Sequence, residues 1–245
     1  MQNMNMNKDT KIAFILYLRI YKKPHTMCGR FTANVKKKDL EEEWNLAVPP
    51  EFRPRYNIAP SQVAGVITNT KPGALSLFRW GLVPSWAKDP AIGNKMINAR
   101  VETLHEKPSF RKLVQTARCL IPATSWFEWM QDKNRQPFVI KPKEAKLFAM
   151  AGLWDTWLDA DGQQVNTFTI ITTEAAQNIR HIHERMPLVV PKELQHEWLS
   201  NNTDAATIAK ISGQLEFDFY PVSSRVNNPK NDDESLLNEF RETLF

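Results

Sequence analysis

The sequence predicts a single α+β domain with a mainly antiparallel, β-barrel-like core and peripheral helices. Of the 245 residues, 42% are hydrophobic and 24% are charged, which is ordinary for a globular protein. Strand-like and helix-like segments alternate along the chain. Most gaps between the strand candidates are too short for a helical crossover, so the strands are expected to pair with antiparallel neighbours in a curled sheet.

Residue patterns place the individual elements. Segments rich in β-branched and aromatic residues are expected to be strands, at residues 62–68, 74–80, 118–121, 126–130, 137–141, 147–154, 165–172 and 215–222. Helical spacing of apolar residues predicts helices at residues 36–46, 109–116, 174–180, 191–199, 204–211 and 234–243. Three prolines make residues 48–56 a loop, and turn residues mark 71–73 and 159–162.

Residues 1–26 differ from the rest and are interpreted as an extension before a domain at 27–245. A polar stretch precedes seven apolar residues and a basic stretch. Seven apolar residues cannot span a bilayer, and no small-residue cleavage site follows. Translation from Met27 is one explanation of the extension. No other targeting signal is visible, so the expected location is the cytoplasm.

The basic charge of the chain is concentrated in that extension. The formal net charge is +5, and residues 1–26 carry five basic side chains and one acidic side chain. A domain without the extension therefore has a net charge of only +1. Any attraction to nucleic acid would have to come from local clusters of arginine and lysine rather than from net charge.

The chain has two cysteines, Cys28 and Cys119, which excludes a disulfide scaffold and a zinc site made of cysteines alone. Glycine-rich phosphate-binding motifs are also absent. Cys28 stands out because Gly29 allows close backbone approach and the charge of Arg30 would favour its thiolate. If Cys28 were the first residue, its amine and thiol could together trap an aldehyde as a five-membered thiazolidine.

Three other segments carry candidate acid–base groups. Asn98, Arg100 and a glutamate lie in INARVET, which also fits a strand that runs into a capped turn. Glu128 lies between aromatic residues in SWFEW, on the face of Trp126 if the segment is a strand, and burial there would raise its pKa. A surface glutamate on an edge strand is the alternative.

The third segment, HIHERMP, contains His181 and His183. A histidine near its ordinary pKa suits acid–base chemistry, whereas a zinc site would need a third ligand such as Glu128 or Cys28. Two further segments, at residues 55–60 and 80–86, place aromatic residues and proline beside basic groups. They fit core packing or a platform on which single-stranded bases stack.

Seven motifs, in order, resemble those of the SOS response-associated peptidase (SRAP) family of abasic-site processing proteins. They are CGRF, RYNIAP, WGLVPSW, INARVET, SWFEW, IHERMP and PVSSRVNN, and the resemblance runs from Met27 to about Asn231. The resemblance implies a single α+β domain that binds single-stranded DNA. It also implies a thiazolidine crosslink between an N-terminal cysteine and the ring-opened aldehyde of an abasic site.

The resemblance assigns roles to particular residues of this chain. It implies Cys28 as nucleophile, Asn98 as a hydrogen-bonding residue that positions it, Glu128 as proton shuttle and His183 as acid–base group. The residues implied in DNA contacts are Arg30, Asn57, Pro60, Trp80, Trp86, Arg100 and Arg185. No metal or other cofactor is expected, and the protein is expected to act as a monomer away from membranes.

The extension departs from the family pattern, because an attached Met27 leaves Cys28 without a free amine. Either translation starts at Met27, or the chain cleaves itself before Cys28 as a peptidase that uses Cys28, Glu128 and His183. Two other functions stay open from the sequence. One is a thiol peptidase that acts on other proteins, with Cys28, His183 and Asn98 as its catalytic group. The other is a non-catalytic module that binds single-stranded DNA.

Overall fold

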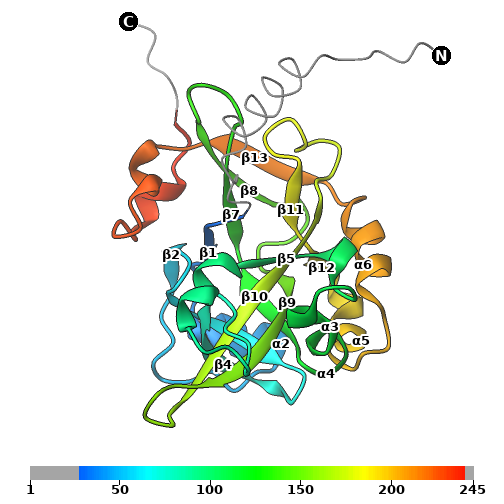
Figure 1. Ribbon diagram of the computed structural model, residues 1–245. Coiled ribbons are helices and arrows are strands. Elements are labelled where there is room, and N and C mark those ends of the chain that lie inside the picture. The colour runs from blue at the N-terminus through cyan, green and yellow to red at the C-terminus, as the bar shows by residue number, and fades with distance from the viewer. Residues whose placement is uncertain (1–27, 241–245) are drawn as a thin grey trace, which may run out of the picture.

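A computed structural model describes residues 28–240 of the chain (Figure 1). The expected extension at residues 1–26 lies outside the described residues. The described part is built from two β-sheets with short helices around them (Figure 1). One sheet closes into a barrel, and the other forms a layer beside it that carries the start of the described chain.

Five strands form the closed barrel. They are β3 (Val63–Thr68), β4 (Lys71–Trp80), β6 (Arg118–Ala123), β9 (Phe148–Leu158) and β10 (Gln164–Glu174). Neighbours in the ring are antiparallel, apart from the parallel contact of β4 with β10 that closes it. Three short strands extend this sheet: β5 (Asn98–Arg100) and β11 (Arg185–Pro187) beside β10, and β12 (Val189–Val190) beside β9.

The second sheet has five strands in the order β13-β8-β7-β1-β2, and every neighbouring pair is antiparallel. Its strands are β1 (Phe31–Ala33), β2 (Arg55–Ile58), β7 (Ser125–Trp129), β8 (Pro137–Pro142) and β13 (Phe217–Pro221). Strand β7 therefore lies inside the sheet, between β8 and β1. This excludes the alternative in which Glu128 is on an edge strand.

The helices are short and peripheral. They are α2 (Lys37–Trp44), α3 (Pro108–Arg111), α4 (Leu113–Thr116), α5 (Gln195–Leu199) and α6 (Ala205–Ser212). Short 3₁₀ segments occur at Pro90–Lys95, Val101–Thr103, Lys192–Leu194, Ser224–Asn227 and Glu234–Leu237. The predicted fold class, an α+β domain with a mainly antiparallel barrel-like core, is confirmed.

Several local predictions were wrong. The helix predicted at residues 174–180 is absent because Glu174 ends β10 and pairs with Arg185 of β11, which forces the intervening residues to turn back. The loop predicted at 48–56 ends in β2, and the turn predicted at 71–73 lies instead just before Lys71, where β4 begins. Of the helix predicted at 234–243, the described residues form only the last 3₁₀ turn.

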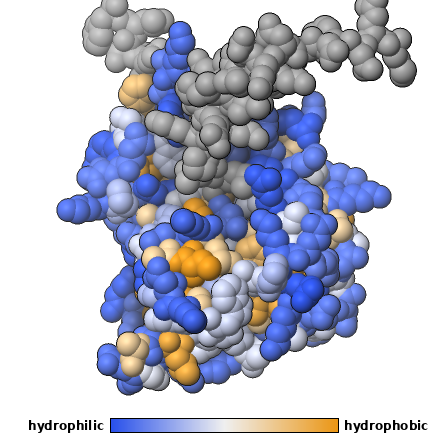
Figure 2. Space-filling model, in the orientation of Figure 1, coloured by the Kyte–Doolittle hydropathy of each residue, from blue (hydrophilic) through white to orange (hydrophobic). Residues whose placement is uncertain are grey.

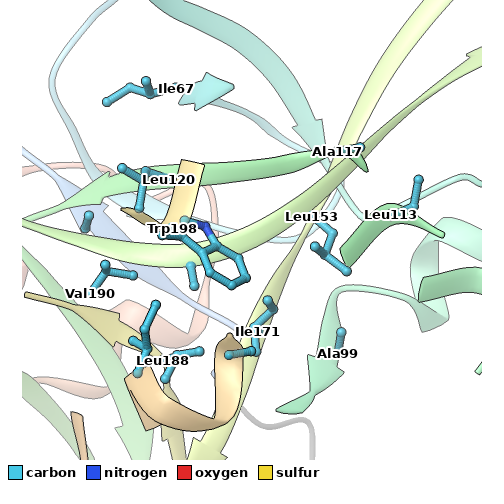
Figure 3. Close-up of a cluster of buried hydrophobic side chains, with 14 of the residues drawn as sticks. Ile67, Ala99, Leu113, Ala117, Leu120, Leu153, Ile171, Leu188, Val190 and Trp198 are labelled. Atoms are coloured by element: carbon cyan, nitrogen blue, oxygen red, sulfur yellow. The ribbon is translucent and has the colours of Figure 1, made fainter. Parts of the chain in front are cut away.

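Alternating side chains on the barrel strands fill two clusters. Leu120, Leu153 and Ile171 face the helices and pack around Trp198 of α5, as Figure 3 shows. The Trp198 indole donates to the Cys119 carbonyl, and the Arg118 guanidinium lies 4.2 Å from its ring centroid. The opposite faces of the same strands form the barrel interior. That second cluster also includes Cys28, so the barrel core supports the start of the described chain.

Unlike the two buried clusters, the surface shown in Figure 2 is mainly hydrophilic, and its hydrophobic side chains lie in small separate groups. Among residues 28–240, no helix has the length and apolar character needed to cross a membrane.

Residues 222–239 form a C-terminal segment that covers the outer face of the second sheet. Val222, Val226 and Leu236 pack there against Phe127 and Val139. The fully buried Asn57 amide of β2 holds this segment, because its Nδ2 donates to three carbonyls of it. The carbonyls belong to Val226, Asn228 and Asn231. The predicted role of Asn57 in DNA binding is therefore corrected, since its polar atoms are engaged inside the fold.

Replacing Asn57 with alanine should destabilise the protein by about 2–4 kcal/mol, because three carbonyls of the C-terminal segment and the Arg30 guanidinium would lose a partner. Urea denaturation measures the free energy of unfolding. The exposed Asn202 is the control, and Asn202→Ala should change the stability by less than about 0.5 kcal/mol. Equal effects of the two substitutions would refute this role of Asn57.

Candidate active site

Cys28 and Glu128 are joined by a buried hydrogen bond. The backbone nitrogen of Cys28 donates to Glu128 Oε1 at 2.8 Å, and both side chains are at most 1% exposed. Antiparallel pairing of β1 with β7 produces this contact: Phe31 lies opposite Trp126, and the Phe127 nitrogen donates to the Arg30 carbonyl. The carboxyl group is therefore held at the α-nitrogen of the one residue that also carries the candidate thiol.

Glu128 has an environment that favours its neutral form. Burial raises the pKa of its carboxyl group to about 8, although the backbone N–H groups of Cys28 and Trp129 act in the opposite direction. The predicted alternation along β7 is confirmed, because Trp126 belongs to the cluster around Cys28 while Phe127 belongs to the cluster on the other face. Near neutral pH this carboxyl group can both give and accept a proton.

Asn98 reaches Cys28 from the barrel sheet. It is the first residue of β5, which pairs in parallel with β10 opposite Ile170. Its Nδ2 donates to the Cys28 carbonyl oxygen at 3.4 Å. The amide thus fixes the carbonyl side of Cys28, while Glu128 contacts the nitrogen side.

His183 lies in the turn between β10 and β11 and borders, with Glu128, a cavity of about 120 Å³. Its Nδ1 accepts from the Arg185 backbone N–H at 3.0 Å and lies 3.2 Å from the Arg185 carbonyl. The backbone of Arg185 thus fixes the orientation of the His183 ring beside this cavity.

An ion pair ties the His183 turn to the Asn98 strand. The Arg185 guanidinium donates to both carboxylate oxygens of Glu102, at 2.5 and 2.9 Å, and to the Thr172 carbonyl. Burial opposes ionisation of Glu102, but its hydrogen bonds and the charges of Arg185 and Arg100 together lower the pKa of that carboxyl group. Glu102 is the glutamate of INARVET, and it engages Arg185, which the resemblance implied as a DNA contact.

The Cys28 thiol is not activated by Arg30. Burial, and then the charge of Glu128, raise the pKa of this thiol well above its ordinary value. Nη1 of Arg30 donates to Asn57 Oδ1 and to the Val226 carbonyl, so the charge points toward the C-terminal segment. The prediction that Arg30 favours a thiolate is therefore wrong. Cys28 also has a φ of 31°, a left-handed conformation that is uncommon for a residue with a side chain.

Comparisons with known proteins identify the family of the chain. The family model described as SOS response associated peptidase (SRAP) matches residues 27–229. The chain belongs to the SRAP family. The abasic site processing protein YoqW of Bacillus subtilis is 44% identical over 86% of this chain and 99% of its own length. YedK of Escherichia coli, with the same description, is 31% identical over 86% and 99%.

A solved structure from Bacteroides thetaiotaomicron matches this SRAP chain with a TM-score of 0.77 at 26% identity. The match covers 87% of this chain and all of the other one. A phage-related protein from Bordetella bronchiseptica matches with a TM-score of 0.60 at 29% identity, over 80% of this chain and 94% of its own.

A larger cavity of this SRAP chain, of about 590 Å³, is bordered by sequence neighbours of Cys28, Asn98 and Glu128. Arg30 and Pro60, both predicted DNA contacts, border it together with Ile97, Trp129 and Arg135. Trp129 Nε1 donates to Asn227 Oδ1 of the C-terminal segment, which forms part of the wall. Sequence reasoning missed Arg135 and Asn227, because only the fold brings their loops to the site.

Three other predicted DNA contacts lie elsewhere. Trp80 is fully buried between Phe31 and Phe168, so the prediction that it stacks against bases is wrong. Trp86 is 61% exposed but borders a separate cavity with Trp154. Arg100 is exposed at the end of β5.

The two histidines of the H-x-H pair do not act together. The His181 ring packs edge-on against Phe219 at 5.1 Å, whereas His183 is buried beside the site. Within residues 28–240, no three His, Cys, Asp or Glu side chains are grouped as metal ligands would be.

The raised pKa of Glu128 should make stability depend on pH. The folded protein holds this proton up to about pH 8, whereas the unfolded chain releases it near 4.5. The contribution of the protonated Glu128 carboxyl group to folding stability is therefore complete below about pH 4.5, and it is lost as the pH rises to 8. Relative to Glu128→Gln, the wild type should lose a few kcal/mol over this range, since one pKa unit corresponds to about 1.4 kcal/mol.

Urea denaturation at pH 5, 6.5 and 8 measures this difference. Glu51→Gln, at an exposed position, should follow the wild type at every pH. Parallel pH profiles of the wild type and Glu128→Gln would show that the Glu128 carboxyl group is not held neutral.

Proposed function

We propose that this chain processes abasic sites in DNA by bonding covalently, through Cys28, to the ring-opened aldehyde of the damaged sugar. The observation that carries the proposal is the buried Glu128 carboxyl group, 2.8 Å from the α-nitrogen of Cys28. An amine, a thiol and an acid–base group then meet at one residue. Relatives over most of the chain are described as abasic site processing proteins, which supports DNA with abasic sites as the substrate.

The proposed reaction consumes no cofactor and releases one water. The free α-amine of Cys28 adds to the aldehyde carbon C1′, and the carbinolamine loses water to give an imine. The Cys28 thiol then adds to the same carbon and its proton passes to nitrogen, which closes a thiazolidine. Two new bonds, C1′–N and C1′–S, hold the sugar.

Each neighbouring group has a role in these steps. Glu128, with a pKa of about 8, gives a proton to the departing hydroxyl group and accepts protons from nitrogen and sulfur. His183 acts as acid–base group for opening the sugar ring and for reversing the crosslink. Asn98 holds the Cys28 carbonyl, so that the amine and the thiol keep their orientation. Because the pKa of the Cys28 thiol is raised, the sulfur must lose its proton as it adds to the imine carbon.

The proposed substrate is single-stranded DNA bound by a monomer. An extruded abasic sugar reaches a buried cysteine most easily from an unpaired strand. Positive charge comes from individual arginines, since the chain beyond residue 26 has a net charge of only +1. Binding should therefore weaken with salt according to a few phosphate contacts. Arg100, exposed beside Asn98, is one such contact.

Two other functions are less well supported. A peptidase that acts on other proteins needs an accessible, readily ionised thiol, whereas Cys28 is buried with a raised pKa. A binding module without chemistry would not need a buried carboxyl group at the Cys28 nitrogen. A covalent adduct with abasic DNA that depends on Cys28 and Glu128 is expected from the proposed function and from neither alternative.

Crosslinking is tested with a chain that begins at Cys28 and an oligonucleotide that carries one abasic site. The wild type should form an adduct that survives denaturing electrophoresis, and Cys28→Ala should form none. Glu128→Gln and His183→Ala should slow the reaction by about 100-fold or more. The exposed Glu51→Gln is the control and should react like the wild type. Equal adduct with Cys28→Ala would refute the proposal, and unchanged rates in Glu128→Gln would refute the role of Glu128.

The amine of Cys28 must be released before it can react. Self-cleavage hydrolyses the bond between Met27 and Cys28 with one water, and the departing nitrogen takes up a proton. Glu128 contacts that nitrogen and is neutral near pH 7, so it can supply the proton. The uncommon φ of Cys28 is consistent with strain at this bond.

Intact mass spectrometry tests self-cleavage on the full chain with a tag before Met1. The wild type should be recovered beginning at Cys28, and Glu128→Gln should keep its tag. A tag retained equally by both proteins would exclude self-cleavage and leave translation from Met27 as the source of a free Cys28.

A further inference from the structure

Arg135 lies between the two cavities of the site. It belongs to the loop that joins β7 to β8, and it borders both the cavity beside Glu128 and His183 and the larger cavity beside Arg30 and Pro60. Trp129 is the other residue that borders both. A ligand that occupies both cavities would therefore lie against the Trp129 and Arg135 side chains.

The loop holds Arg135 in a defined position. Asp132 Oδ1 accepts from the backbone N–H groups of Asn134 and Arg135, at 3.1 and 2.8 Å. Arg135 has a φ of 48°, so the chain turns sharply at this residue. The Met130 nitrogen donates to the Gln136 carbonyl and closes the base of the loop. Local hydrogen bonds therefore fix the backbone from which the Arg135 side chain extends.

The guanidinium of Arg135 differs from those of the other arginines around the site. Arg30 is engaged by Asn57 and Val226, and Arg185 by Glu102. Arg135 is exposed and forms no ion pair or side-chain hydrogen bond with the residues the structure describes. Its five N–H donors can meet an anionic ligand without breaking a contact of the fold.

The two cavities differ in size in a way that fits a strand of DNA. The smaller one, at about 120 Å³, equals the volume of about four water molecules, which is the scale of a pentose fragment. The larger one, at about 590 Å³, is in the range of sites for whole small ligands, such as a nucleotide. A phosphate that joins an abasic sugar to its neighbouring nucleotide would lie at the boundary.

We propose that Arg135 binds the phosphate between the abasic sugar and the nucleotide that occupies the larger cavity. The proposal rests on the proposed function for the identity of the ligand. Arg135 is then a binding residue that selects a sugar within a DNA strand over a free sugar, and it takes no part in the covalent steps.

The test compares Arg135→Gln with Lys133→Gln in the chain that begins at Cys28. Lys133 is exposed on the same loop and borders neither cavity, so its variant controls for the loss of one positive charge. Two substrates are used, an abasic oligonucleotide and free 2-deoxyribose, whose aldehyde carries no phosphate. Arg135→Gln should slow crosslinking to the oligonucleotide about tenfold and leave the rate with deoxyribose unchanged. Lys133→Gln should change neither rate.

Binding without reaction gives a second readout. In a Cys28→Ala background, loss of one phosphate contact should reduce the slope of log Kobs against log[salt] by about 0.7 for single-stranded DNA. An unchanged slope, or an equal loss of rate with both substrates, would overturn the role of Arg135. A wild-type chain that reacts with neither substrate would refute the proposed function, and the salt slope would still decide the role of Arg135.

Discussion

The hydrogen bond from the Cys28 nitrogen to Glu128 is the interaction on which the rest of the site depends. It forms inside the structure, where β1 lies beside β7 and the barrel core packs beneath both strands. Burial raises the pKa values of the carboxyl group and of the thiol, so both are neutral near pH 7. Burial of Cys28 beside Glu128 therefore keeps both side chains in their neutral forms near pH 7.

The remaining groups are brought to this bond by contacts between distant segments. Asn98 arrives on a strand of the barrel sheet, and His183 arrives on the following turn of the same sheet. The Glu102–Arg185 ion pair joins these two supports. On the other side, Asn57 fixes the C-terminal segment that forms a wall of the larger cavity. The relative positions of Cys28, Asn98, Glu128 and His183 therefore rely on polar contacts that span most of the described chain.

Local patterns in the sequence predicted the parts of this arrangement that depend on near neighbours. The alternation in SWFEW placed Glu128 on the face of Trp126, and the short gaps between strands predicted antiparallel pairing. Burial by residues that are far apart in the sequence could not be predicted from such patterns. Trp80 looked like a base-stacking residue but fills the barrel, and Arg30 looked like an activating charge but binds the C-terminal segment. The position of Arg135 depends on a loop that carries no marked motif.

The central claim is that the α-nitrogen and the sulfur of Cys28 both bond to one carbon of the abasic sugar. Peptide mass spectrometry of the digested adduct tests it most directly. The N-terminal peptide should gain the sugar fragment less one water, and its Cys28 should resist alkylation at sulfur and acylation at nitrogen. An adduct carried on a lysine, or one in which the Cys28 thiol is still alkylated, would refute a thiazolidine at Cys28.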